Sequence, residues 1–312
     1  MSSSFAQRLL ALVRLGRPHF LVGGFVLYGL GAALAALAGA VVDGPRYVWG
    51  QAAITAIQLM THYCNDYFDF AADQANTTST RFSGGSRVLP GGSLSPRVAL
   101  VAAVVLAGVA LLATLVLVRL PGVAPAAAPL LLMMLALAWE YSAPPLRLHS
   151  RGLGELTTAL VVTLLTPLAG FYLQAGRFTA LPFLTVLPLC AFQFAMLLAI
   201  EFPDAAGDAS VGKRTLVVRL GGARAARLYN AVLLAAYLSL PPLVLAGMPA
   251  PIALAVAATA PVSVWQARRM ARGAWAQPAR WESLTLVAVA LVGVSSILML
   301  GAAVWMLARR TP

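Results

Sequence analysis

The stretch from residue 98 to residue 118 reads VALVAAVVLAGVALLATLVLV and carries no charged side chain. An α-helix rises about 1.5 Å per residue, so about 20 apolar residues are enough to cross the hydrocarbon layer of a bilayer. We therefore predict that this stretch forms a membrane-spanning helix.

Similar apolar runs recur along the 312-residue chain, of which 60% is hydrophobic and only 10% is charged. A soluble domain carries about 25% charged residues, so the chain is far from that class. We predict an all-α fold, a polytopic membrane bundle of nine transmembrane helices that forms a single domain over residues 1–312. The helices are expected at residues 19–41, 47–69, 98–118, 123–142, 153–174, 179–201, 226–246, 250–267 and 284–307.

The basic residues are unevenly divided between the two ends of these helices. With the N-terminus placed in the cytoplasm, most of the 22 Lys and Arg residues fall in cytoplasmic segments. The positive-inside rule then predicts N-in/C-out topology. The net charge of +12 is thus interpreted as a topology signal and a contact with anionic membrane lipid, and no nucleic acid partner is expected. The first 16 residues are expected to be a basic amphipathic lead-in rather than a cleaved signal.

The chain has only ten acidic residues, and most of them fall in two groups with the same spacing. The groups are Asp66, Asp69 and Asp73, and Glu201, Asp204 and Asp208. The i, i+3, i+7 spacing places the carboxylates of each group on one face of a helix. Each group lies at the predicted cytoplasmic end of a helix, the second and the sixth.

Carboxylates stacked on one helix face repel each other, and near a membrane they cannot all stay ionised without a cation. A site made of carboxylates, with few His or Cys residues nearby, favours a hard ion, with Mg²⁺ ahead of Mn²⁺. The alternative is that both groups are solvated helix ends, but two matched groups favour a metal site.

Three motifs carry a resemblance to a known family. The first acidic group reads Asn65-Asp-Tyr-Phe-Asp-Phe-Ala-Ala-Asp73, and the second reads Asp204-Ala-Ala-Gly-Asp208, followed by Gly212-Lys-Arg-Thr-Leu-Val-Val-Arg-Leu-Gly221. Together they resemble the UbiA superfamily of intramembrane prenyltransferases, which have nine helices and aspartate-rich motifs on helices two and six. With Pro144-Pro145-Leu-Arg-Leu-His-Ser-Arg-Gly-Leu-Gly-Glu155, they are most similar to the 1,4-dihydroxy-2-naphthoate polyprenyltransferases of menaquinone biosynthesis.

The resemblance implies Mg²⁺-dependent transfer of a prenyl group from an isoprenyl diphosphate to an aromatic acceptor. It further implies a prokaryotic cell (inner) membrane location, with the active site facing the cytoplasm. The residues expected to act in catalysis and to bind the metal are Asp66, Asp69, Asp73, Asp204 and Asp208.

Metal, diphosphate and five carboxylates together leave an excess of negative charge, which nearby basic residues should offset. Lys213, the only lysine, stands out among these basic residues as a compact point charge. The residues expected to bind substrate are Asn65, Arg87, Arg147, Lys213, Arg214 and Tyr141. Each has a structural alternative: a topology determinant for the basic residues, capping or packing for Asn65, and an interface anchor for Tyr141.

The sequence departs from the naphthoate subfamily before Asp204, where Ile200-Glu201-Phe202-Pro203 replaces the usual Asn-Asn-x-Arg. The acceptor therefore stays open between the naphthoate and homogentisate, 4-hydroxybenzoate or a lipid precursor. Another class, a cation-coupled transporter, would place its acidic residues near the bilayer midplane on broken helices. Glu201 is left without a role, and His62 is either structural or a proton acceptor.

Overall fold

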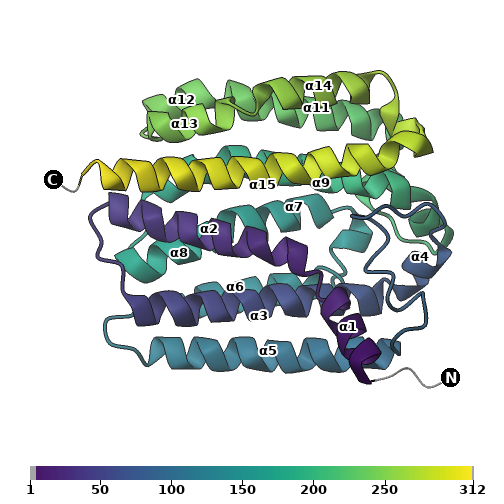
Figure 1. The fold of residues 1–312 in the computed structure, drawn as a ribbon, viewed down its shortest axis with the longest axis horizontal. Helices are drawn as coiled ribbons and strands as arrows, with labels where there is room; N and C mark the ends of the chain where they lie inside the picture. The colour runs from purple at the N-terminus through teal and green to yellow at the C-terminus, as the bar shows by residue number, and fades with distance from the viewer. Residues whose placement is uncertain (1–4, 311–312) are drawn as a thin grey trace.

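The computed structural model describes residues 5–310, and within that range the chain is helical and contains no strand. Figure 1 shows long helices that lie side by side along a common direction, with short helices and loops at their ends. The unbroken long helices are α2 (Pro18–Leu37), α3 (Gly44–Phe68), α5 (Pro96–Val118), α6 (Ala127–Glu140), α9 (Ala180–Ser210) and α15 (Pro278–Ala308).

Three further segments are built from successive shorter helices. They are α7 (Gly154–Thr158), η2 (Ala159–Leu165) and α8 (Thr166–Ala175); α11 (Gly222–Leu238) and α12 (Leu240–Leu245); and α13 (Ala250–Ala257) and α14 (Ala260–Ala271). The remaining short elements are α1 (Phe5–Leu15), α4 (Phe70–Ala75), η1 (His149–Arg151), α10 (Leu216–Leu220) and η3 (Ala274–Ala276).

Each of the nine apolar segments predicted from the sequence lies on helix in the structure. Among residues 5–310, six helices are long and apolar enough to cross a membrane, or seven if the bent pair α13–α14 counts as one span. The number nine stays a prediction, because α6 has only 14 residues and α3 carries polar side chains such as Gln51 and Gln58. The chain is a multi-pass membrane protein.

Helix α5 shows how the bundle meets the lipid. Its small residues Ala103 and Ala110 are fully buried, and α5 packs closely along α3. Its larger residues, such as Val104 and Leu112, are more than half exposed. Small residues inside and large apolar residues outside are typical of membrane helices, whose association depends on close backbone packing.

Helices α2 and α8 cross at two glycines. A Cβ atom at Gly31 would collide with the carbonyl oxygen of Pro167, and one at Gly170 would collide with the carbonyl oxygen of Tyr28. Only glycine permits this approach of two backbones. Just before the crossing, η2 widens into a π-helical turn, which gives room for the ring of Pro167 and for the carbonyl group that cannot bond to it.

The buried apolar residues form two clusters that share α2. One cluster draws mainly on α9, α11, α13 and α15, and the other on α3, α5, α6 and α8. Helix α1 lies at one end of the bundle and the end of α15 lies at the other, as an odd number of membrane crossings requires (Figure 1). Which of these ends faces the cytoplasm stays a prediction.

Candidate functional site

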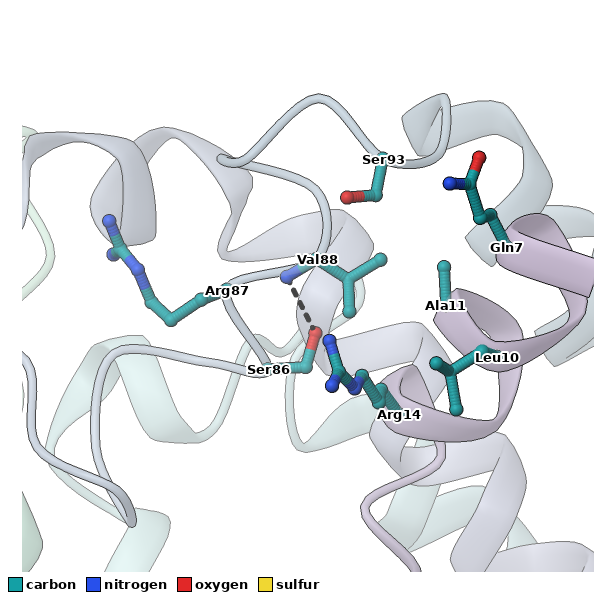
Figure 2. A pocket seen from close by; sticks show the side chains of 8 residues that line it. All are labelled: Gln7, Leu10, Ala11, Arg14, Ser86, Arg87, Val88 and Ser93. Carbon is teal, nitrogen blue, oxygen red and sulfur yellow. Dashed lines mark hydrogen bonds between the residues drawn. The ribbon is translucent and has the colours of Figure 1, made fainter. Parts of the chain in front are cut away.

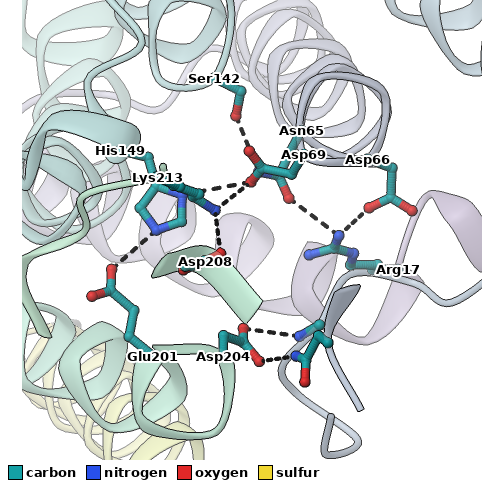
Figure 3. A network of polar contacts seen from close by, with 12 residues as sticks. Arg17, Asn65, Asp66, Asp69, Ser142, His149, Glu201, Asp204, Asp208 and Lys213 are labelled. Carbon is teal, nitrogen blue, oxygen red and sulfur yellow. Dashed lines mark hydrogen bonds and ion pairs between the residues drawn. The ribbon is translucent and has the colours of Figure 1, made fainter. Parts of the chain in front are cut away.

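The two acidic groups are far apart in the chain but lie close together in the fold. Figure 3 shows Asp66 and Asp69 of the first group near Glu201, Asp204 and Asp208 of the second. Asp66 lies in the last turn of α3, Asp69 joins α3 to α4, and Asp73 lies in α4. Asp204 and Asp208 lie in the last two turns of α9, against which α4 packs. The first group does not lie on one helix as the spacing suggests, because the helix breaks at Asp69. The packing of α4 on α9 brings the carboxylates of the two groups to the same part of the molecule.

Lys213 joins the two groups. Its Nζ lies 2.9 Å from Oδ2 of Asp69 and 3.4 Å from Oδ1 of Asp208. The tight turn after α9, with Gly212 at φ 77°, folds the chain back so that the amide of Lys213 donates to the carbonyl of Asp208 at 2.9 Å. The lysine is buried, and the neighbouring carboxylates outweigh its desolvation and raise its pKa.

Arg17 lies on the other side of the first group. Its guanidinium donates to Oδ1 of Asn65 at 3.2 Å and also forms an ion pair with Asp66. The amide of Asn65 in turn donates to Asp69 at 2.6 Å and to the hydroxyl of Ser142 at 3.0 Å. Asn65 thus orients Asp69, while Arg17 supplies the cation that Asp66 needs.

The loop after α4 lies over both groups. The amide of Asn76 donates to Asp204 at 2.7 Å, and the backbone N–H of Gly84 donates to the same carboxylate at 2.9 Å. The backbone N–H of Ser86 and the hydroxyl of Ser86 both donate to Asp66. This loop therefore holds one carboxylate from each group in place.

Arg87 does not point at the carboxylates. Its guanidinium donates to the backbone carbonyls of Asp73 and Asn76 and so holds the end of α4. A cavity of about 420 Å³ lies between α1 and the loop at residues 86–93, and Figure 2 shows the Arg87 side chain directed away from it. A change at Arg87 would therefore act first on the position of Asp73.

His149, Tyr141 and Glu201 form a buried unit beside Asp69. The His149 ring stacks on Tyr141 at 4.8 Å; its Nε2 lies 3.0 Å from Glu201, and its Nδ1 lies 3.7 Å from Asp69. Burial and Lys213 lower the pKa of His149, but the two carboxylates outweigh them and raise it to about 9. Glu201 belongs to this unit: one of its carboxylate oxygens contacts His149, and the other accepts from the backbone N–H of Val217 at 3.4 Å.

Two predicted substrate-binding residues lie outside this network. Arg147 and Arg214 are exposed, and within residues 5–310 their side chains form no hydrogen bond or ion pair. Both lie on loops at the same end of the bundle, and the backbone amide of Arg214 donates to the carbonyl of Ser150 at 3.0 Å. Their role in substrate binding stays a prediction.

The donor set suits a hard cation. Among the described residues, the carboxylate of Asp73 makes no hydrogen bond or ion pair, although it is buried. Burial, and then the charges of Asp69 and Asp66, raise the pKa of Asp73 to about 8. Arg17 and Lys213 act on Asp73 in the opposite direction, but neither pairs with it directly. A buried carboxylate that forms no ion pair, next to others of its kind, is a place where Mg²⁺ fits.

The carboxylates do not form a ready-made metal cage in this conformation. Within residues 5–310, no three His, Cys, Asp or Glu side chains are close enough together to hold an ion. Lys213 and Arg17 lie between the carboxylates and pair with them. Metal binding therefore requires these two cations to exchange partners.

A cavity of about 320 Å³ begins at Arg17, Asn65 and Tyr141 and extends between the helices. Its walls come from α2, α3, α6, α7, η2, α9 and α15, and most of its lining is apolar. Most ligand sites are apolar cavities with a few polar groups at defined points. This cavity has its charged groups at one end, beside the carboxylates.

Sequence reasoning missed Arg17, Asn76 and His149. Arg17 was counted only among the basic residues that set the topology, and nothing in its local sequence pairs it with Asp66. His149 lies inside the quoted motif that ends at Glu155, and this was the one available signal. All three residues contact the site aspartates, Asp66, Asp204 and Asp69, from distant parts of the chain.

Comparison with known proteins agrees with this geometry. Residues 25–287 match the UbiA prenyltransferase family. A 1,4-dihydroxy-2-naphthoate octaprenyltransferase of Mycobacterium leprae is 30% identical over 197 residues, which are 60% of this chain and 64% of that relative. The alignment thus spans less than two thirds of the relative's length.

Solved structures agree on the fold. A UbiA homologue from Aeropyrum pernix has a TM-score of 0.68 at 18% identity, over 92% of this chain and 98% of its own. A UbiA homologue from Archaeoglobus fulgidus, bound to GPP and Mg²⁺, has a TM-score of 0.64 at 15% identity, over 96% and 99% of the two chains. The expected family is confirmed: this chain belongs to the UbiA prenyltransferase family.

Proposed function

We propose that this protein transfers a prenyl group from an isoprenyl diphosphate to an aromatic acceptor, namely 1,4-dihydroxy-2-naphthoate, in a reaction that needs Mg²⁺. The single observation that carries the proposal is the meeting of the two aspartate groups around Lys213, at the charged end of an apolar cavity. An isoprenyl diphosphate matches this cavity, because it has a charged head at one end and an apolar chain along the rest of its length.

The donor head would bind at the carboxylates. Asp66, Asp69, Asp73, Asp204 and Asp208 would hold Mg²⁺, whose charge stabilises the diphosphate as it leaves. Lys213 and Arg17 would then turn from the carboxylates to the phosphate oxygens. Support comes from the A. fulgidus homologue, which was solved with GPP and Mg²⁺.

Two more of the predicted side chains, Asn65 and Tyr141, border this position. Asn65 would orient Asp69, and the ring of Tyr141, stacked on His149, would face the prenyl carbon as positive charge develops on it. Arg87, Arg147 and Arg214 would supply charge from the loops, Arg87 after release from the end of α4.

The reaction balances without another reactant. The allylic C–O bond breaks and diphosphate keeps the electron pair. The ring carbon that bears the carboxylate donates an electron pair to the prenyl carbon and forms a C–C bond. The C–C bond to the carboxylate then breaks, and CO₂ leaves. The apolar walls of the cavity keep water from capturing the allylic cation.

The choice of acceptor rests on the M. leprae relative and on the motif at residues 144–155. Homogentisate, 4-hydroxybenzoate and a lipid precursor are the alternatives, because the segment before Asp204 departs from the naphthoate pattern. We further propose nine spans from the apolar runs, and N-in/C-out topology with the site on the cytoplasmic side from the distribution of basic residues. The prokaryotic inner membrane location is proposed from the family resemblance.

The test is incubation of the purified protein with Mg²⁺, geranylgeranyl diphosphate and a panel of these acceptors, followed by product mass spectrometry. Asp69→Ala and Asp204→Ala should abolish product while the protein stays folded. Asp43→Ala is the matched control, since Asp43 caps the far end of α3 by accepting from Arg46 N–H at 2.8 Å. Wild-type turnover in either site variant would refute the metal assignment. Cation flux through the purified protein in proteoliposomes, without any prenyl donor, would instead support a cation-coupled transporter.

A further inference from the structure

One wall of the 320 Å³ cavity is polar. Gln58, Thr61, His62 and Asn65 all line it and all lie on α3. Their spacing of three and four residues places them on one face of the helix. The stripe thus begins beside Asp66 and runs about 10 Å into the bundle, at about 1.5 Å per residue.

Other hydroxyl groups in the cavity are already paired within their own helices. Thr158 donates to the carbonyl of Glu155 at 3.1 Å, Thr166 to that of Val161 at 3.0 Å, and Ser296 to that of Val292 at 2.8 Å. Thr61 on the stripe does the same with the carbonyl of Ile57. These hydroxyl groups need no ligand to satisfy them.

Gln58 and His62 differ from these residues. Within residues 5–310, neither side chain makes a hydrogen bond, and Oε1 of Gln58 is buried without a partner. A polar group deprived of water and partner costs free energy, above all inside a membrane protein. One turn of helix separates the two side chains, and both line the cavity. Oε1 of Gln58 packs against Gly24 of α2, so the amide must turn slightly to meet a ligand.

Aromatic rings border the same place. The ring of His62 stacks on that of Phe20 at 5.9 Å and a tilt of 30°, and Phe20 meets Phe82 edge to face at 6.2 Å. Phe82 belongs to the loop that covers the aspartates. Flat rings that border a polar pair suit a flat, oxygen-bearing ligand rather than a branched hydrocarbon chain.

We propose that Gln58 and His62 bind the polar head of the aromatic acceptor, through its hydroxyl or carboxylate oxygens, with its ring against Phe20. The isoprenoid tail then lies along the apolar walls, which α9 and α15 line with Met196, Leu197 and Val292. This subsite rests on the proposed function and assigns its acceptor end. It lies within two turns of Asp66, so the acceptor ring carbon can reach the carbon that the diphosphate leaves.

Steady-state kinetics on the purified full chain, with Mg²⁺ and geranylgeranyl diphosphate, test the subsite through two variants of similar shape, Gln58→Leu and His62→Phe. Each should raise the KM for the acceptor about tenfold, the loss expected for a hydrogen bond to a charged group such as the acceptor carboxylate, and leave the KM for the diphosphate within about twofold. Gln51→Leu is the matched control on the same helix: Gln51 does not line the cavity, and its amide donates to Thr55 at 3.0 Å. It should change neither KM.

An unchanged acceptor KM in Gln58→Leu, or an equal rise in both KM values, would overturn the subsite, and Gln58→Leu alone decides if His62→Phe does not fold. Failure of the proposed function is a separate result, in which the wild-type protein yields no prenylated product with any acceptor of the panel. Equilibrium binding of the acceptor without donor should weaken in the same two variants, and unchanged binding would contradict the subsite.

Discussion

Nζ of Lys213 lies 2.9 Å from Oδ2 of Asp69, although the two residues are 144 positions apart in the chain. This contact ties the loop after α9 to the end of α3, and the lysine's second contact, with Asp208, brings in the other acidic group. All three side chains are buried, so bulk water cannot replace the lost partner if one is removed.

Lys213→Met should lower kcat/KM for the prenyl diphosphate at least about 100-fold. Removing one preorganised charged donor from a site where charge develops in the transition state typically costs about 2.7–4 kcal/mol, that is, about 100- to 1000-fold in rate. Lys213→Arg should recover only part of the loss, because a planar guanidinium does not replace a compact ammonium. Arg224→Met, at an exposed arginine on α11, is the control for loss of charge alone. Equal kcat/KM values in Lys213→Met and Arg224→Met would contradict the role of Lys213.

The packing of α5 against α3 gives a test of the fold. Ala103 is fully buried, whereas the neighbouring Val104 is 55% exposed on the outer face. Ala103→Leu should destabilise the protein by about 1–3 kcal/mol through overpacking, and Val104→Leu should have almost no effect. Thermal unfolding in one detergent measures both variants. If the two variants lowered the unfolding temperature by similar amounts, the inner and outer faces of α5 would be wrongly assigned.

The helices could be predicted well because long apolar runs depend only on local sequence. The run at residues 98–118 became Pro96–Val118. The sixth predicted helix, 179–201, was too short: α9 continues to Ser210. The last turns of α9 are polar and contain Pro203, so the apolar run that predicts the helix ends before the helix does. Packing against α4 and the contact between Asp208 and Lys213 stabilise these last turns.

The site was predictable in part for the same reason. The five aspartates are recognisable by their spacing within two short stretches of sequence, and Lys213 stands out as the only lysine. The partner of Asp66 is not recognisable, because Arg17 is 49 positions away and reaches it only after α2 and α3 have packed. Arg147 and Arg214 show the converse: closeness in sequence to a motif did not bring their side chains into the network.

Glu201 should matter for stability through His149. Glu201→Leu removes the carboxylate nearest to the buried His149 ring, whose Nδ1 then has Asp69 at 3.7 Å, and we expect this loss to cost about 3 kcal/mol. Glu201→Gln keeps an oxygen that can accept from Nε2 and should cost less. Unfolding in detergent measures both. The control is Glu140→Leu, because among residues 5–310 the Glu140 carboxylate accepts only from the backbone N–H of Leu146, at 2.9 Å. Equal losses in Glu201→Leu and Glu140→Leu would refute the buried pair.

Arg17 should act on donor binding. Its guanidinium contacts both Asn65 and Asp66 and lines the mouth of the cavity, so it is the cation best placed to move from a carboxylate to a phosphate oxygen. Arg17→Ala should raise the KM for the prenyl diphosphate about tenfold or more, since a hydrogen bond to a charged group contributes about 1.5–3 kcal/mol. Arg17→Lys should recover little of it, because one ammonium cannot reproduce the two-sided contact of the guanidinium.

The matched control for Arg17 is Arg14, which lies one turn earlier in the chain, is exposed and faces the other cavity (Figure 2). Both residues carry the same charge near the same membrane surface, so a purely electrostatic attraction of the diphosphate would weaken equally in Arg14→Ala and Arg17→Ala. Such an attraction would also fade with added salt. If the KM for the diphosphate rises in Arg17→Ala alone and does so at high salt as well, the direct contact is supported. A parallel, salt-sensitive rise in both variants would refute it.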